Sequence, residues 1–176
     1  MDIVNSSEKF IIESQLNRKI YNVMDISKRC CYGYPQVIKS YPLKAGVPFP
    51  TLYWLTCPYL IKVVSDMESE GKISELQNII SKDENLKSEF VEAHKSEIKE
   101  RFRIAENEIL KLPEVMIQKM KNTGIGGIKN FETVKCLHLH LASFLGGTKN
   151  PVGRIVWGKI SSKECFDKQC IIFEQE

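Results

Sequence analysis

The chain has 176 residues, of which 43% are hydrophobic and 27% charged, and its formal net charge is +3. This length predicts one domain, residues 1–176, with a hydrophobic core of its own. The small net charge gives no strong nucleic-acid signal, and it leaves the partners unknown. We expect no membrane span and no secretion signal, because there is neither a run of about 18 apolar residues nor a basic N-terminus followed by an apolar stretch. We therefore expect a cytoplasmic protein whose six cysteines are thiols or metal ligands rather than disulfides.

Residues 1–57 are predicted to be the strand-rich part of the chain. The predicted elements are a helix over 6–17 capped by Ser6 or Ser7, strands over 19–28 and 34–41, a loop over 43–50 and a buried strand over 51–56. Alternating, branched and aromatic residues favour the strands, whereas Gly46, Pro48 and Pro50 favour the loop. Together these elements predict a small, mostly antiparallel sheet.

Residues 58–176 are predicted to be mainly helical. The predicted helices cover 58–70, 73–82, 84–110, 113–122, 131–145 and a last one that starts at Asn150 and Pro151. Proline suits the first helical position, because the N–H that it lacks has no partner there. The tail from Gln169 to Phe173 is predicted to return as an edge strand. The fold class is therefore α+β, a sheet of three to four strands packed by about six helices.

Four cysteines each lie in a distinctive short segment: Cys30 in Arg-Cys-Cys-Tyr-Gly, Cys57 in Leu-Thr-Cys-Pro, Cys136 in Val-Lys-Cys-Leu-His and Cys170 in Lys-Gln-Cys-Ile. They are far apart in the sequence, so only the fold could bring them together. Four thiolates that meet would bind zinc or an iron–sulfur cluster. Close Cys-x-x-Cys pairs, which structural zinc often uses, are absent, and this favours a cluster. The alternative for each cysteine is a small buried hydrophobe.

Two of these cysteines have a specific local setting. Cys57 precedes the helix that opens with Pro58, and the positive end of a helix lowers a thiol pKa, as a metal ligand or nucleophile requires. In a helix over 131–145, Cys136 and His140 would share one face, away from the apolar stripe. Both side chains could then bind one metal ion, or that face could pack against another element.

Other polar residues fit weaker hypotheses. His94 lies in an apolar helical stripe, where a core histidine is commoner than a functional one, and His138 flanks such a stripe. Either could serve as a base for Cys57 in a metal-free enzyme, or move protons beside a metal centre. Arg101 and Arg103 are expected to be solvated or ion-paired. The glycine-rich segment 123–128 lacks the strand and the Lys-Ser/Thr end of a phosphate-binding loop, so we expect a plain turn.

Several motifs together resemble an uncharacterised bacterial family, the domain of unknown function numbered five hundred and one. They are Arg29-Cys30 with Gly33 and Pro35, the block from Pro48 to Pro58, His94, the block from Val134 to His138, and Asn150 to Gly153. The resemblance runs from about residue 20 to the end of the chain, and the Pro48 block is long and specific. The family implies no established activity.

The resemblance also implies a choice of site residues. The family pattern has cysteines at Cys30, Cys57 and Cys136 and one near the C-terminus, which is Cys170 or Cys165 here. It has histidines at His94 and His138, whereas His140 lies outside it. The adjacent Cys31 leaves open which cysteine of that pair is the ligand.

Three functions follow from these patterns. The first is a metal or iron–sulfur protein with Cys30, Cys57, Cys136 and Cys170 as ligands and with His94 and His138 as candidate catalytic residues. The second is a metal-free enzyme with an activated cysteine and a histidine base. The third is a non-catalytic interaction protein whose long charged helix is the contact face.

Overall fold

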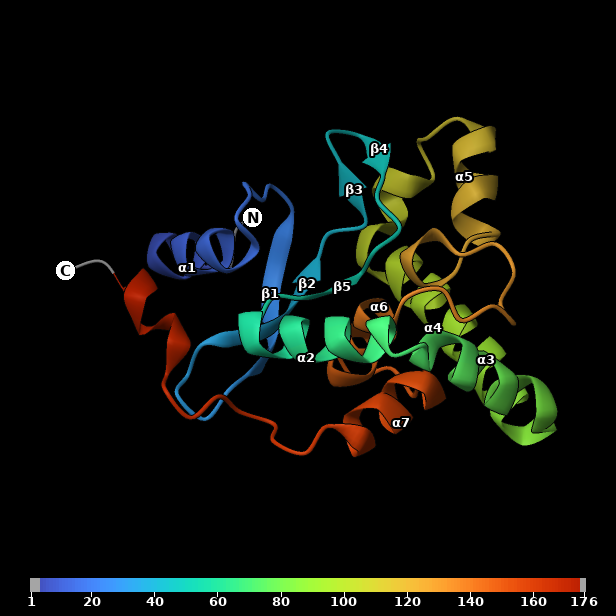
Figure 1. The fold of residues 1–176 in the computed structure, drawn as a ribbon. Coiled ribbons are helices and arrows are strands. Elements are labelled where there is room, and N and C mark those ends of the chain that lie inside the picture. Colours follow the sequence, from blue (N-terminus) through green and yellow to red (C-terminus); the bar gives the residue numbers. More distant parts are fainter. Residues whose placement is uncertain (1–3, 175–176) are drawn as a thin grey trace.

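The structure is a computed structural model, and it describes residues 4–174 (Figure 1). Its strands are β1 (Val23–Arg29), β2 (Pro35–Ser40), β3 (Leu43–Lys44), β4 (Val47–Pro48) and β5 (Tyr53–Leu55). Its α-helices are α1 (Ser6–Leu16), α2 (Pro58–Ser69), α3 (Lys72–Lys82), α4 (Glu84–Ile109), α5 (Glu114–Lys121), α6 (Leu137–Leu145) and α7 (Pro151–Lys159). Two short 3₁₀ helices, η1 (Ile125–Gly127) and η2 (Gln169–Phe173), complete the set. The predicted α+β class is confirmed.

The main sheet has the order β1-β2-β5, and both pairings are antiparallel. Val37 of β2 lies opposite Leu55, and both side chains join the core that the helices cover. The next pair, Ile38 and Trp54, turns to the other face and packs in the smaller core beneath α1. Strand β2 is therefore covered on both faces, which explains why its burial does not alternate.

The helical body is built from apolar pairs spaced one turn apart. Such pairs face one side of a helix and give each helix a stripe that points into the core. The buried pairs are Leu60 and Val64 of α2, Leu76 and Ile80 of α3, Leu137 and Leu141 of α6, and Val152 and Val156 of α7. Within residues 4–174, no helix is both long and apolar enough to cross a membrane.

Three predicted elements differ from the structure. The predicted loop over 43–50 contains the small β3–β4 hairpin, whose turn places Ala45 and Gly46 in the left-handed region. The predicted helix over 131–145 begins only at Leu137, because the Val134 N–H donates to the Gln77 side chain at 2.8 Å rather than to a helical carbonyl. The tail forms η2 beside α1 instead of an edge strand, and the Gln15 side chain holds it there through Cys170.

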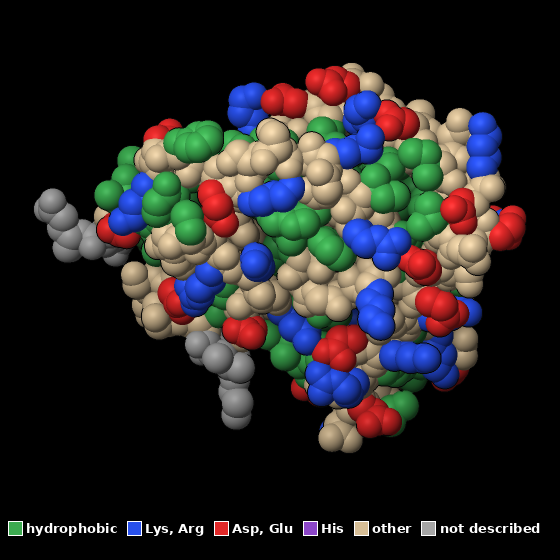
Figure 2. Space-filling view, turned by 90° about the horizontal axis from the view of Figure 1, so that it is seen from below, with side chains coloured by type: hydrophobic (Ala, Val, Ile, Leu, Met, Phe, Trp, Pro, Cys, Tyr) green, Lys and Arg blue, Asp and Glu red, His purple; other side chains and the backbone are tan. Residues whose placement is uncertain are grey.

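The surface mixes charges of both signs. On the face shown in Figure 2, Lys and Arg side chains are interspersed with Asp and Glu side chains rather than gathered into one basic patch. Helix α4 is charged on its outer side, but its inner side carries buried residues such as Phe90 and His94. The long charged helix is thus part of the core as well as of the surface.

Arg101 of α4 is buried, and the prediction that it is solvated or ion-paired was wrong. Its guanidinium donates hydrogen bonds to the carbonyl oxygens of Pro50 at 2.8 Å, Gly124 at 3.1 Å and Met120 at 3.2 Å, and also to that of Thr123. The planar fork of donors suits several carbonyls at once. Arg101 thereby ties the loop before β5 to the glycine-rich turn, whereas Arg103 stays exposed and pairs with Glu100 as expected.

We expect Arg101→Met to lower the free energy of unfolding by at least about 3 kcal/mol, because it leaves buried carbonyl groups without donors. Arg103→Met is the matched control on the same helix, and we expect it to unfold close to the unchanged protein. Urea denaturation followed by circular dichroism measures both variants. Equal stability of the two variants would contradict the role given to Arg101.

Candidate functional site

The candidate site lies where the end of α2 meets the start of α6. Cys136 is the N-cap residue of α6, and its extended backbone makes no side-chain capping hydrogen bond. The cap is supplied from α2 instead: the Glu68 carboxylate accepts the Leu137 N–H at 2.6 Å. A carboxylate is favourable there, because the free N–H groups give a helix N-terminus partial positive charge.

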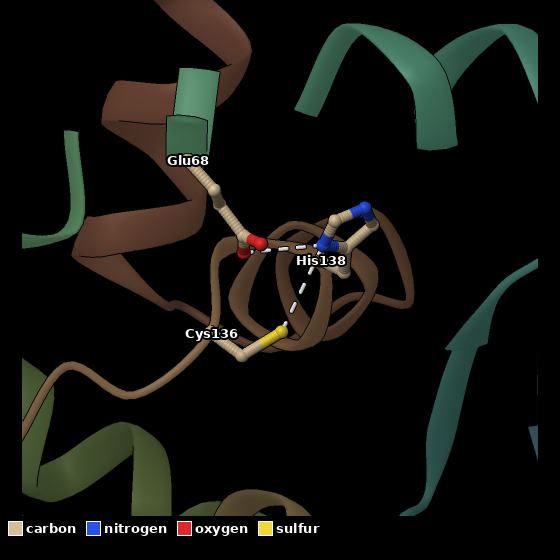
Figure 3. A group of neighbouring side chains, drawn as sticks. All are labelled: Glu68, Cys136 and His138. Carbon is tan, nitrogen blue, oxygen red and sulfur yellow. Dashed lines mark hydrogen bonds and ion pairs between the residues drawn. The ribbon is translucent and has the colours of Figure 1, made fainter. Parts of the chain in front are cut away.

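Glu68, Cys136 and His138 form a compact cluster (Figure 3). The His138 Nδ1 atom lies 3.1 Å from Glu68 Oε1 and 3.8 Å from Cys136 Sγ. Among residues 4–174, this is the one group of three or more His, Cys, Asp or Glu residues whose ligand atoms all lie within 4.8 Å of one another. The cluster is half-buried, since about a quarter of the Glu68 and His138 side chains is exposed.

The other ring nitrogen of His138 fixes the protonation of the imidazole. Figure 3 shows this nitrogen turned away from Glu68 and Cys136. Nε2 lies 3.1 Å from the Ile61 carbonyl oxygen, which can only accept, so Nε2 carries a hydrogen. The Ser65 hydroxyl is also within reach of Nε2, at 3.2 Å. In neutral His138, Nδ1 would then carry no hydrogen, and its lone pair would face the Glu68 carboxylate and the Cys136 sulfur.

Positive charge between these three electron-rich atoms would stabilise the group. A second proton on the ring is one source: the hydrogen bond to Cys136, helped by the Glu68 charge, raises the pKa of His138 to about 9, although burial opposes this. A metal ion bound by the three atoms is the other source. In that case the Nε2–H bond to a carbonyl is the outer-shell contact that metal-binding histidines usually make.

A cavity of about 220 Å³ adjoins the cluster. Cys136 and His138 form part of its lining, and the rest comes from Thr51, from β5 and from Leu139 and Ala142 of α6. Most of these walls are apolar, including Trp54, Leu55 and Leu139. A larger cavity, about 700 Å³, lies along α4 and contains neither a cysteine nor a histidine in its lining. We therefore associate any chemical role of the site with the cavity of about 220 Å³ beside Cys136 and His138.

The four predicted cysteine ligands are not one group in the described part of the chain. Cys136 lies beside Glu68 in the last turn of α2, whereas Cys57 caps the start of that helix. Cys57 and Glu68 are eleven positions apart along α2, an axial rise of about 16 Å. Cys30 follows β1, Cys57 follows β5 and Cys170 contacts Gln15 of α1, whereas Cys136 contacts His138 of α6. Metal binding by these cysteines stays a prediction.

Cys57 is the N-cap residue of α2, as predicted, but its thiol is not activated. Burial raises the pKa of Cys57 to about 12, because desolvation outweighs the backbone N–H groups of the helix. The helix end alone therefore does not make this thiol a nucleophile. The ring-nitrogen contacts of His94 and His138 are made with other residues, so they do not support either histidine as a base for Cys57. Cys136 instead contacts a histidine directly.

His94 and His140 are core residues. The His94 Nδ1 atom accepts the Ile125 N–H at 3.0 Å, and its ring stacks on Phe131 with centroids 4.9 Å apart. Burial, with the charge of Arg101, lowers the pKa of His94 to about 4. His140 is buried beside Asn150, so it does not share a metal-binding face with Cys136. His94 thus holds the glycine-rich turn and does not reach the cluster.

Sequence reasoning identified Cys136 and His138 but missed Glu68. Glu68 belongs to no motif, and it comes from a helix that precedes Cys136 by a long stretch of chain. The signal that could have found it is the bare N-terminus of α6, because Cys136 cannot cap this helix and acidic groups favour that position.

The fold and the site define a small α+β protein with a half-buried Glu, Cys and His cluster beside a cavity. Residues 26–158, more than half of the chain, match the family described as Protein of unknown function (DUF501). The chain belongs to this family, which confirms the resemblance seen in its motifs. Searches of curated proteins and of solved structures each find no match.

We expect His94→Asn to change how stability depends on pH. The His94 pKa is lowered from 6.5 to about 4 by folding, so its contribution is complete above pH 6.5 and is lost as the pH falls toward 4. Asparagine keeps an acceptor near the Ile125 N–H but does not titrate. Between pH 6 and 4.5, the slope of the unfolding free energy should be lower in the variant by about 1.4 kcal/mol per pH unit.

The measurement is a series of urea denaturations of both proteins across this pH range. All other titrating groups are shared, so the difference between the two slopes isolates His94. Parallel slopes would mean that His94 is not held neutral in the core.

Proposed function

We propose that this protein binds one zinc ion through Glu68, Cys136 and His138. The observation that carries the proposal is the orientation of His138, whose Nδ1 faces Glu68 Oε1 and Cys136 Sγ while Nε2 donates to the Ile61 carbonyl. One carboxylate, one thiolate and one imidazole are ligand types that zinc accepts. Calcium and magnesium prefer oxygen ligands, so the sulfur and nitrogen disfavour them.

The number of protein ligands favours a reactive centre over a structural one. Structural zinc is bound by four protein ligands, whereas zinc that does chemistry keeps one position open for water or substrate. Three ligands are present here, and the apolar cavity of about 220 Å³ adjoins two of them. A zinc ion at such a place supplies a Lewis acid or an activated water. The cavity volume suits a small substrate group.

The second candidate is a metal-free centre in which Cys136 is the nucleophile and His138 its base. It is favoured by the direct contact of Cys136 Sγ with the imidazole, at 3.8 Å. In a nucleophile triad, however, the carboxylate and the nucleophile contact opposite ring nitrogens. Here Glu68 and Cys136 both face Nδ1 and a backbone carbonyl takes Nε2, so the zinc reading accounts for the geometry better.

We expect the full chain to bind one zinc ion, and Cys136→Ala and His138→Ala to weaken this binding. Each weakening should exceed the roughly 10- to 100-fold that loss of an outer-shell partner causes. Glu68→Gln keeps an oxygen that can accept the Leu137 N–H, so it tests the ligand role without removing the helix cap. Competition with a chromophoric chelator measures all affinities, and circular dichroism verifies folding.

Asp66→Asn and Cys31→Ser are the matched controls, because both residues are exposed and lie outside the cluster. They should bind zinc like the unchanged protein. Absence of stoichiometric zinc, or equal affinity in Cys136→Ala, would refute the proposal. Rapid alkylation of Cys136 in the presence of saturating zinc would favour the metal-free candidate instead.

A further inference from the structure

The segment after α7 returns to the sheet and contains two cysteines, Cys165 and Cys170. In Figure 1 this last segment runs from α7 back to the side of α1. Three hydrogen bonds to its backbone carbonyl groups hold it in place. The Tyr59 hydroxyl donates to Ser162 at 3.2 Å, and the Gln36 amide donates to Lys163 at 3.2 Å. The Tyr32 hydroxyl donates to Phe166 at 3.4 Å. These anchors come from α2, β2 and the β1–β2 turn.

The Pro35 carbonyl is the common point around which three cysteines lie. Gln15 donates both to this carbonyl at 2.9 Å and to Cys170 Sγ at 3.3 Å. The Thr56 hydroxyl donates to the same carbonyl at 3.2 Å, and Cys57 is the next residue. On the turn side, the Cys30 N–H donates to the carbonyl of Tyr34, the residue before Pro35, at 2.9 Å.

Cys165 joins this group through its neighbour Glu164. The Gln36 amide lies 3.3 Å from the Glu164 carboxylate, and Gln36 directly follows Pro35. Electrostatics agree with this placement. Besides burial, the charges of Cys30 and Cys165 raise the pKa of Cys170, and those of Cys170 and Cys165 raise the pKa of Cys57. The charges of Cys30 and Cys165 also raise the pKa of Cys31, after burial and the charge of Glu164, so these effects indicate a shared neighbourhood and the contacts around Pro35 select the ligands.

Two buried glutamines at this place have unsatisfied groups. Gln15 is 8% exposed and Gln36 is fully buried, yet the Oε1 atom of each has no hydrogen-bond partner within residues 4–174. An amide oxygen only accepts hydrogen bonds, so thiolates would not satisfy these two atoms; the amide Nε2 groups are the parts of both side chains that can donate to sulfur. Both side chains already contact the cysteine-bearing segments, Gln15 at Cys170 and Gln36 at Glu164.

We propose that Cys30, Cys57, Cys165 and Cys170 form a second centre, which binds an iron–sulfur cluster. Four cysteine thiolates are the usual ligands of such clusters. The spacing favours a cluster over a single zinc ion. Zinc holds its sulfurs about 3.8 Å apart, given a Zn–S bond of about 2.3 Å. No three of these sulfurs lie within 4.8 Å of one another. A cluster places iron and sulfide between the thiolates and so spans a wider group.

The experiment uses the full chain, incubated with iron and sulfide without oxygen and then freed of unbound reagent. We expect a brown protein with a visible charge-transfer band that contains iron and sulfide in equal amounts. Cys57→Ser and Cys170→Ser should lose most of the bound iron and the band. Cys165→Ser tests a partly exposed ligand whose replacement disturbs little of the core. Circular dichroism verifies the fold of every variant.

Cys31→Ser and Cys136→Ser are the controls, and both should keep the band. Cys31 is the exposed neighbour of Cys30, and Cys136 belongs to the cluster with Glu68 and His138. A colourless unchanged protein would overturn the proposal, as would equal loss of iron in Cys136→Ser or zinc uptake by these thiols in place of iron. Because Cys136→Ser should lose zinc and retain iron, failure of one centre is distinguishable from failure of the other.

Discussion

The hydrogen bond from the Leu137 N–H to the Glu68 carboxylate, 2.6 Å long, sets the geometry on which the candidate site depends. It joins the last turn of α2 to the first turn of α6. Cys136 is the residue just before that turn, and His138 lies within it, so both side chains reach the carboxylate that holds the helix in place. The structural cap and the proposed metal site are therefore the same feature of the fold.

Helix α2 separates two chemically different regions. At its start, Cys57 is buried in the region where we propose the second, cysteine-bound centre. At its end, Glu68 meets one thiol and one imidazole. The first region is rich in sulfur and suits a cluster, whereas the second mixes oxygen, sulfur and nitrogen and suits zinc. Assigning all four predicted cysteines to one ion does not fit this arrangement, because Cys136 lies at the other end of the helix.

The sequence predicted local features better than contacts between distant segments. Asn150 and Pro151 do begin a helix, and the Asn150 side chain caps it, because capping depends on neighbouring residues. Cys136 was misplaced inside a helix, since the Gln77 side chain that keeps residue 134 out of that helix comes from α3. Arg101 looked like a surface residue for the same reason: its carbonyl partners belong to three other segments. Charge and helical period carry no information about such partners.

X-ray absorption at the zinc edge of protein loaded with one equivalent of zinc would identify the ligands of the proposed zinc site. We expect one sulfur neighbour at about 2.3 Å together with nitrogen and oxygen neighbours at about 2.0–2.2 Å, the shell that Cys136, His138 and Glu68 would give. A shell without sulfur would contradict it, and so would a shell of three or four sulfurs.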